Sequence, residues 1–227
     1  MIKRSSVPAL AIAAAIPACS MVTAADDTDT TRDSIRGGEA ESGMPAVGLV
    51  AFGSSYCTGT LIAPNVVLTA AHCIGPLPTT FDGRPVSEKL PYPSYVNLGC
   101  PNPTRDIGLL RLATPITSIA PMDWGASPAK EETCTVVGFG RYDGMERRKR
   151  SGTSRIVDVT GNAVKVTWGD ALANAGDSGG PLVCGDQIVA TAACHTDGDG
   201  PSHRHEYYQR IDEARGWIEK TIAAWTP

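Results

Sequence analysis

From residue 46 onward, the chain alternates between short apolar, β-prone runs and short stretches rich in Gly, Pro, Asn and Asp. This spacing predicts an all-β sandwich or barrel rather than βαβ units. The tetrad TGNA at 160–163 predicts a hairpin turn. The predicted strand-forming runs are 46–52, 58–70, 95–98, 106–112, 133–140, 154–168, 179–194 and 207–211.

The C-terminal segment has a different period. Its apolar residues recur at the spacing of one helix face, with Asp212 as the predicted N-cap. We expect this helix to pack against the β core, and we expect the Pro-rich stretch from Pro115 to Pro128 to cross between two β halves. The predicted apolar face consists of Ala214, Trp217, Ile218, Ile222 and Trp225.

Composition narrows the possible partners. The 227 residues, with 42% apolar content, 24 Gly and 17 Pro, suit a loop-rich globular protein. The 24 acidic and 20 basic residues give a net charge of −4, which is too balanced to indicate a nucleic acid or a membrane surface as a partner.

The first 25 residues have the pattern of an export signal: two basic residues, a short apolar stretch and then small residues up to Ala25. An N-terminal core helix and a lipoprotein anchored through Cys19 are the alternatives. The acidic, Thr-rich segment 26–34 is interpreted as a short pro-segment or linker. We therefore expect a secreted protein, extracellular or periplasmic, with no membrane contact after signal removal.

The cysteines support export. Removal of Cys19 with the signal would leave six, and an even number in an exported chain predicts disulfide bonds. No Cys-x-x-Cys pair is present, and the His and Asp residues between His195 and His205 fit no standard zinc spacing, so we expect no metal.

The segment GDSGGP, Gly176–Pro181, is the strongest chemical signal. Glycines on both sides of Ser178 permit a tight turn that exposes the hydroxyl and lets a substrate approach the backbone. A serine needs a base to accept its proton. His72, at the end of the apolar run NVVLTAAHC, is the candidate, because the other three histidines lie in a Gly, Asp and Ser-rich stretch.

The base in turn needs an acceptor for its second ring N–H. Asp106 opens the apolar run DIGLLRL and is the candidate, although the same pattern also fits a strand cap.

Five motifs in this order resemble the chymotrypsin/trypsin family of serine endopeptidases. The resemblance covers residues 35–227 and implies two antiparallel six-stranded β-barrels, about 35–120 and about 121–227, with the active site between them and a C-terminal α-helix. The motifs are IRGG (35–38), LTAAHC (68–73), DIGLLRL (106–112), VVGFGR (136–141) and GDSGGPL (176–182).

The resemblance also implies a mechanism. Ser178 attacks the scissile carbonyl, His72 acts as general base and then acid, and Asp106 orients His72. The backbone N–H groups of Gly176 and Ser178 form the oxyanion hole, and no cofactor is needed. Protein or peptide substrates, protein inhibitors and a monomeric state are expected. The alternative is a protease-like binding protein without turnover.

In this family, cleavage of the pro-segment creates an α-amino group that pairs with the acid before the serine. Here the pair would be Ile35 and Asp177. Ser34 precedes the cleavage point, so an activator with the trypsin preference for basic residues does not fit.

The resemblance assigns the disulfides Cys57–Cys73 and Cys134–Cys184. Cys100 and Cys194 remain, and Asn174 stands where the family often has a partner for Cys194. We predict the pair Cys100–Cys194, since the loops that carry them should approach each other across the substrate cleft.

The substrate pocket departs from the trypsin pattern. Leu172 occupies the floor position where a trypsin-like enzyme has aspartate, and Ala192 is expected to narrow the entrance. Glu206 either projects into the pocket, where it would favour a basic side chain, or points outward from a loop. We favour an apolar or small residue before the cleaved bond.

Overall fold

The computed structural model describes residues 35, 37–101, 104–140, 148–168, 170–171, 173–196 and 205–226. The expected signal and pro-segment, 1–34, therefore lie outside the described residues. All of the described residues belong to one compact unit, 31–227.

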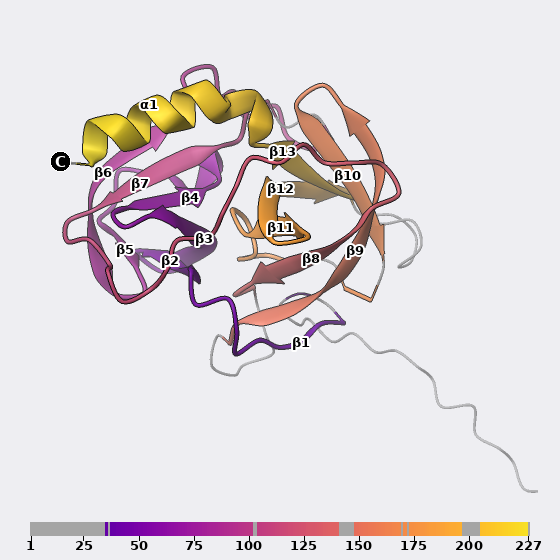
Figure 1. Cartoon of the computed structure of the whole chain (residues 1–227), viewed down its shortest axis with the longest axis horizontal. Coiled ribbons are helices and arrows are strands. Elements are labelled where there is room, and N and C mark those ends of the chain that lie inside the picture. Colours follow the sequence, from indigo (N-terminus) through magenta and orange to yellow (C-terminus); the bar gives the residue numbers. More distant parts are fainter. Residues whose placement is uncertain are drawn as a thin grey trace, which may run out of the picture. The chain divides into compact units, whose positions relative to one another are not determined.

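The first half of the chain closes into a six-stranded antiparallel barrel with the strand order β2-β3-β4-β7-β6-β5 (Figure 1). Its interior is filled by fully buried apolar side chains, among them Val50, Leu61 and Leu110. The strands are β2 (Val47–Phe52), β3 (Ser55–Ala63), β4 (Val66–Thr69), β5 (Thr79–Phe81), β6 (Arg84–Pro91) and β7 (Gly108–Leu112).

The second half forms another six-stranded antiparallel barrel, ordered β9-β10-β13-β12-β11-β8 and closed by β8 against β9. The short β1 (Glu39–Ala40) adds to β9, although it precedes the first barrel in the chain. The strands are β8 (Thr133–Gly138), β9 (Arg150–Thr160), β10 (Ala163–Trp168), β11 (Pro181–Cys184), β12 (Gln187–Thr196) and β13 (His205–Arg210). Both barrels agree with the predicted all-β fold.

The segment between β7 and β8 connects the barrels. The amide of Met122 donates to the carbonyl of Leu61 in the first barrel, and the amide of Gly125 donates to that of Ile188 in the second. The predicted turn at 160–163 joins β9 and β10, with Gly161 at φ +55°.

A C-terminal helix, α1 (Arg215–Trp225), lies along the first barrel beside β6 and β7 (Figure 1). Ile218 and Trp225 are buried in an apolar cluster that also contains residues of both barrels. The prediction of Asp212 as N-cap is wrong: a 3-10 turn, η3 (Asp212–Ala214), precedes the helix, and the Asp212 carboxylate instead accepts hydrogen bonds from Ser127 and Arg210. No helix in the described ranges is both long and apolar enough to cross a bilayer.

The observed strands differ from the predicted runs in two ways. The run 95–98 is not a strand, since Val96 makes only an isolated bridge with Thr104. Conversely, β1, β5 and β6 lie outside the predicted runs.

Candidate active site

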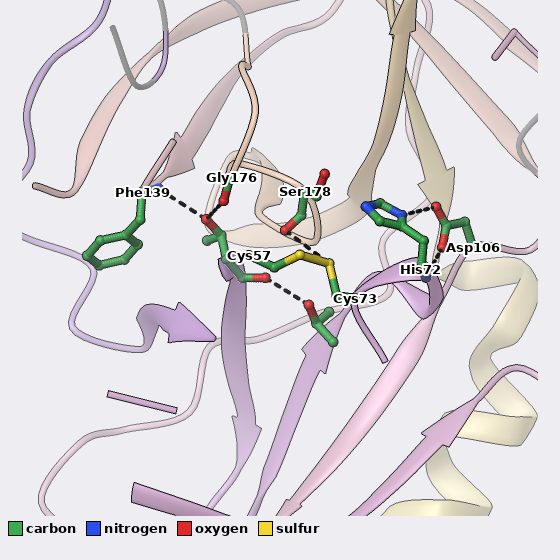
Figure 2. The surroundings of a disulfide bond; sticks show 9 residues. Cys57, His72, Cys73, Asp106, Phe139, Gly176 and Ser178 are labelled. Atoms are coloured by element: carbon green, nitrogen blue, oxygen red, sulfur yellow. Dashed lines mark hydrogen bonds and ion pairs between the residues drawn. A yellow bond between two sulfur atoms is a disulfide. The ribbon is translucent and has the colours of Figure 1, made fainter. Parts of the chain in front are cut away.

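His72 lies in the 3-10 turn η1 (Ala71–Cys73), just past the end of β4. Its ring Nδ1 is 2.6 Å from Asp106 Oδ2, and its backbone N–H donates to Asp106 Oδ1 at 2.8 Å (Figure 2). The Asp106 carboxylate, which is only 5% exposed, therefore holds both the ring and the main chain of His72. A carboxylate accepts hydrogen bonds, so this contact favours the tautomer with the proton on Nδ1 and the lone pair on Nε2.

A residue of the second barrel supports Asp106. The backbone N–H of Asp106 donates to Gln209 Oε1 at 3.1 Å, and Gln209 is fully buried in β13. Sequence reasoning missed this contact. The only available signal was a polar residue within the apolar run YYQRI.

Ser178 lies in the Gly-rich turn before β11, and this turn packs against the first barrel. The Ser178 carbonyl accepts the N–H of Thr58 at 2.8 Å, and Thr58 Oγ1 donates to the carbonyl of Gly176 at 3.0 Å. Gly179 has φ +79°, and a Cβ there would lie 2.5 Å from the Thr58 carbonyl oxygen and 2.7 Å from the Ala70 nitrogen. Glycine is therefore required for the two barrels to approach so closely.

The structure thus places Ser178 beside His72. The Ser178 carbonyl oxygen is 3.8 Å from Sγ of Cys73, the neighbour of His72. Among the hydrogen bonds of the described residues, none joins the Ser178 hydroxyl to the His72 ring. Catalytic hydrogen bonds often tighten only in the substrate complex.

Two amides lie next to this hydroxyl. In the described part of the chain, neither the N–H of Gly176 nor that of Ser178 donates a hydrogen bond. Gly176 has φ +101°.

Asp177 is buried at 1% exposure, and within the described residues three backbone N–H groups are seen to donate to its carboxylate. Oδ2 accepts from Ile35 at 3.0 Å and from Asn174 at 2.7 Å, and Oδ1 accepts from Gly140 at 2.6 Å. The structure therefore brings together Ile35 and Asp177, which are 142 residues apart in sequence. Ile35 has φ +41°, a strained value for a β-branched residue.

Three disulfides are present, in the expected pairings. Cys57–Cys73 lies within the first barrel and Cys134–Cys184 within the second. Cys100–Cys194 joins the two barrels.

A narrow cavity of about 20 Å³ opens beside Ser178, and its lining includes Asn174, Ala192 and Glu206. Glu206 lies in β13 and is 1% exposed, so the interpretation as an outward loop residue is wrong. The Tyr208 hydroxyl donates to its Oε2 at 3.4 Å. Leu172 lies outside the described residues.

Ala192 does not present free backbone groups to this cavity. Its N–H donates to Gly180 and its carbonyl accepts from Gly179, both at 2.8 Å. A β-bulge follows between Ala192 and Cys194, so Ala193 and Cys194 are the next residues along the cleft.

A second cavity, of about 220 Å³, contains His72 and Asp106. Tyr95 also lines it, and burial together with the negative charge of Asp106 raises the pKa of its phenol to about 12.

In the described part of the chain, two groups of side chains bring possible metal-ligand atoms close together, but the cysteines of both are joined in disulfides. The first group is Cys57, His72 and Cys73, and the second is Glu132, Cys134 and Cys184. Of the His and Asp residues considered as metal ligands, Asp197, Asp199 and His203 lie outside the described residues.

Two closed β-barrels, with a His–Asp pair on one and a Gly-flanked serine on the other, define the class of chymotrypsin-like serine proteases. A family model described as Trypsin matches residues 35–218. The chain therefore belongs to the trypsin family, whose members are serine-type endopeptidases.

Individual relatives agree with this assignment. Kallikrein-2 of Homo sapiens is 28% identical over 221 residues, covering 78% of this chain and 84% of the relative. Thrombin-like enzyme agkihpin-1 of Gloydius halys is 26% identical over 211 residues, covering 75% and 87%. The fold also matches the structure of neuropsin, a serine protease expressed in mouse brain, with a TM-score of 0.70 at 22% identity over 85% of this chain and 99% of that one.

Proposed function

We propose that this protein is a catalytically active, secreted serine endopeptidase that cleaves protein or peptide substrates through an acyl-enzyme. Ser178 is the nucleophile, His72 the general base and Asp106 the residue that orients His72. The observation that carries the proposal is the double contact of Asp106 with the ring and backbone of His72, beside Ser178.

The reaction proceeds in two halves. His72 Nε2 takes the Ser178 proton as Oγ attacks the scissile carbonyl carbon, and His72 then returns the proton to the leaving amine as the peptide bond breaks. Water attacks the resulting ester by the same route, which releases the acid product and restores Ser178. Asp106 stabilises the imidazolium that forms in both halves.

The tetrahedral oxyanion is stabilised by the amides of Gly176 and Ser178. Such donors typically contribute about 3 kcal/mol each to transition-state stabilisation. Their lack of partners within the described part of the chain supports this role.

Activation occurs by cleavage before Ile35. The nitrogen of Ile35 already lies 3.0 Å from Asp177, and cleavage turns it into an ammonium that pairs with the buried carboxylate. Cleavage also removes the preceding carbonyl and, with it, the strain at φ +41°, of about 1–3 kcal/mol for such a residue.

The pocket beside Ser178 receives the side chain before the cleaved bond. Its volume of about 20 Å³ and the small side chain of Ala192 in its lining support an apolar or small residue there. Glu206 contributes a carboxylate to the same pocket. Three disulfides agree with export to an oxidising compartment, where the enzyme acts as a monomer and meets protein inhibitors.

The test is fluorophosphonate labelling of the protein cleaved before Ile35, alongside Ser178→Ala. Labelling at Ser178 alone, with hydrolysis of peptides, is expected. A correctly cleaved and folded protein that does not label overturns the proposal in favour of a protease-like binding protein.

A further inference from the structure

One cavity of the cleft is built from both barrels. The cavity of about 220 Å³ next to His72 has the loop Tyr95–Gly99 as its wall on the first barrel, and Ala193 and Cys194 of β12 as its wall on the second. The Cys100–Cys194 disulfide connects these two walls, since Cys100 directly follows Gly99.

The β12 wall offers a strand edge. β11 pairs with β12 as far as Thr191, and Gly179 and Gly180 continue that pairing at Ala192. Beyond this point, Cys194 pairs with Tyr207 of β13 on one side, and the opposite side faces the loop Tyr95–Gly99. An extended peptide binds most readily by adding a strand to such an edge. The residues before the cleaved bond would then run past Ala193 toward Cys194.

The disulfide leaves no room for a peptide to continue along this path. Neighbouring strands lie about 4.8 Å apart, so a third strand between two backbones needs roughly twice that separation. The Cα atoms of Cys100 and Cys194 are 5.8 Å apart. An extended chain can therefore occupy the cavity beside His72 but cannot pass between these two residues.

A larger hollow lies on the other side of this crossing. It has a volume of about 490 Å³, shares Leu98 and Thr104 with the first cavity, and continues over Pro101, Lys165 and Tyr207. The disulfide lies beside this junction, because Pro101 of the larger hollow directly follows Cys100, and Tyr207 of the same hollow pairs with Cys194.

We propose that the Cys100–Cys194 disulfide limits substrate recognition to about two residues before the cleaved bond. Cys194 is two residues past Ala192 in the strand, and a paired substrate strand advances by the same length per residue, about 3.3 Å. A longer substrate leaves the cleft at this point and makes no use of the hollow beyond it. This inference rests on the proposed endopeptidase function and adds the length of substrate that the site recognises.

The test uses the cleaved enzyme and peptide substrates with one to four residues before a common reporter leaving group. In wild type, kcat/KM rises from one residue to two and then changes by less than about threefold, since a well-used additional subsite contributes about tenfold for each 1.4 kcal/mol of binding. A gain of about tenfold or more from the third and fourth residues in wild type overturns the proposal.

The variant Cys100→Ser/Cys194→Ser separates the bridge from the rest of the cleft. The third and fourth residues should raise its kcat/KM by about tenfold or more, because the larger hollow becomes reachable. The variant Cys100→Ala/Cys194→Ala should show the same gain as the serine variant, which distinguishes loss of the bridge from the effect of added polar side chains. No gain with longer peptides in either folded variant overturns the role of the bridge.

Fluorophosphonate labelling keeps the two proposals distinguishable. Wild type that labels and cleaves peptides, but gains from long substrates, overturns only the length limit. Wild type that neither labels nor cleaves overturns the endopeptidase function and the length limit together. If the variants fail to fold, the wild-type series alone decides.

Discussion

The backbone N–H of Asp106 donates to Oε1 of Gln209 across 3.1 Å, and this bond joins the first barrel to β13 of the second at the proposed triad. Gln209 is fully buried, and the Asn162 side chain also donates to the same oxygen at 3.5 Å. Because Asp106 holds His72 through two hydrogen bonds, we expect Gln209 to act on the histidine through the aspartate, as a positioning residue.

Gln209→Met should lower kcat more than it changes KM. The substitution keeps the length of the side chain but leaves the buried Asp106 N–H without its acceptor, at a cost of about 1–3 kcal/mol in the free energy of unfolding. Asp106 then shifts relative to His72, so the pH dependence of kcat/KM should change as well. Steady-state kinetics across pH and urea unfolding measure both effects.

Asn65→Leu is the matched control. Asn65 is also buried and donates to the carbonyl of Trp225 at 2.7 Å, away from the triad. The Asn65→Leu substitution should lower the free energy of unfolding by a similar amount and leave the pH profile of kcat/KM unchanged. Equal kinetic effects in the two variants would show that Gln209 contributes to stability alone.

Tyr95 should remain protonated well above the usual range of tyrosine. Burial, and then the charge of Asp106, raise its pKa to about 12, so the folded state binds this proton more tightly than the unfolded state. The associated stability is present below pH 10 and lost as the pH rises toward 12. At pH 11 about a tenth of Tyr95 should be ionised, against about nine-tenths at the ordinary pKa.

Absorbance at the tyrosinate band, with Tyr95→Phe subtracted, isolates this group. Asp106→Asn should lower the midpoint and leave it above 10, because burial, the larger cause, remains. An unchanged midpoint would mean that the charge of Asp106 does not reach the phenol. The same variant should lower kcat by about 10⁴-fold, the effect of this change in a trypsin triad.

Gly179→Ala should be strongly destabilising. The added methyl would clash with the Thr69 hydroxyl, the Thr58 carbonyl and the Ala70 nitrogen, and this overpacking costs about 1–3 kcal/mol. The left-handed backbone at φ +79° adds strain for any residue with a side chain. Gly185→Ala, at φ +59° with open space around it, should cost only the strain, about 1 kcal/mol. Urea unfolding compares them; equal losses would contradict the close contact between barrels.

The fold was largely predictable because most strands carry β-prone runs ended by turn residues. β6 was missed because RPVSEKLP contains two prolines and mostly exposed side chains, so it lacks an apolar alternation. The run 95–98 was wrongly predicted as a strand because it is apolar without being buried. Val96 and Leu98 are 51% and 65% exposed and line the cleft, so their apolar character does not mark a core strand.

The site was predictable where the chemistry is local. Ser178 and His72 lie in short motifs with distinctive neighbours, whereas the contact between Asp106 and Gln209 spans 103 residues and involves a backbone donor that any residue has. The backbone pairing of Ala192 depends on strand register and on the β-bulge that follows it. Neither leaves a signature in the sequence.

Asp177→Asn should abolish most activity in the protein cleaved before Ile35. The carboxylate accepts from Ile35, Asn174 and Gly140, whereas an amide has one oxygen and would turn its NH₂ toward a donor. Loss of a buried ion pair costs about 3–5 kcal/mol, and the turn that carries the proposed oxyanion hole loses its anchor. The rate of fluorophosphonate labelling measures this directly.

The control is Asp186→Asn, at an exposed hairpin turn, which should label at the same rate as wild type. If Asp177→Asn also labels at that rate, the pair of Ile35 and Asp177 does not order the site.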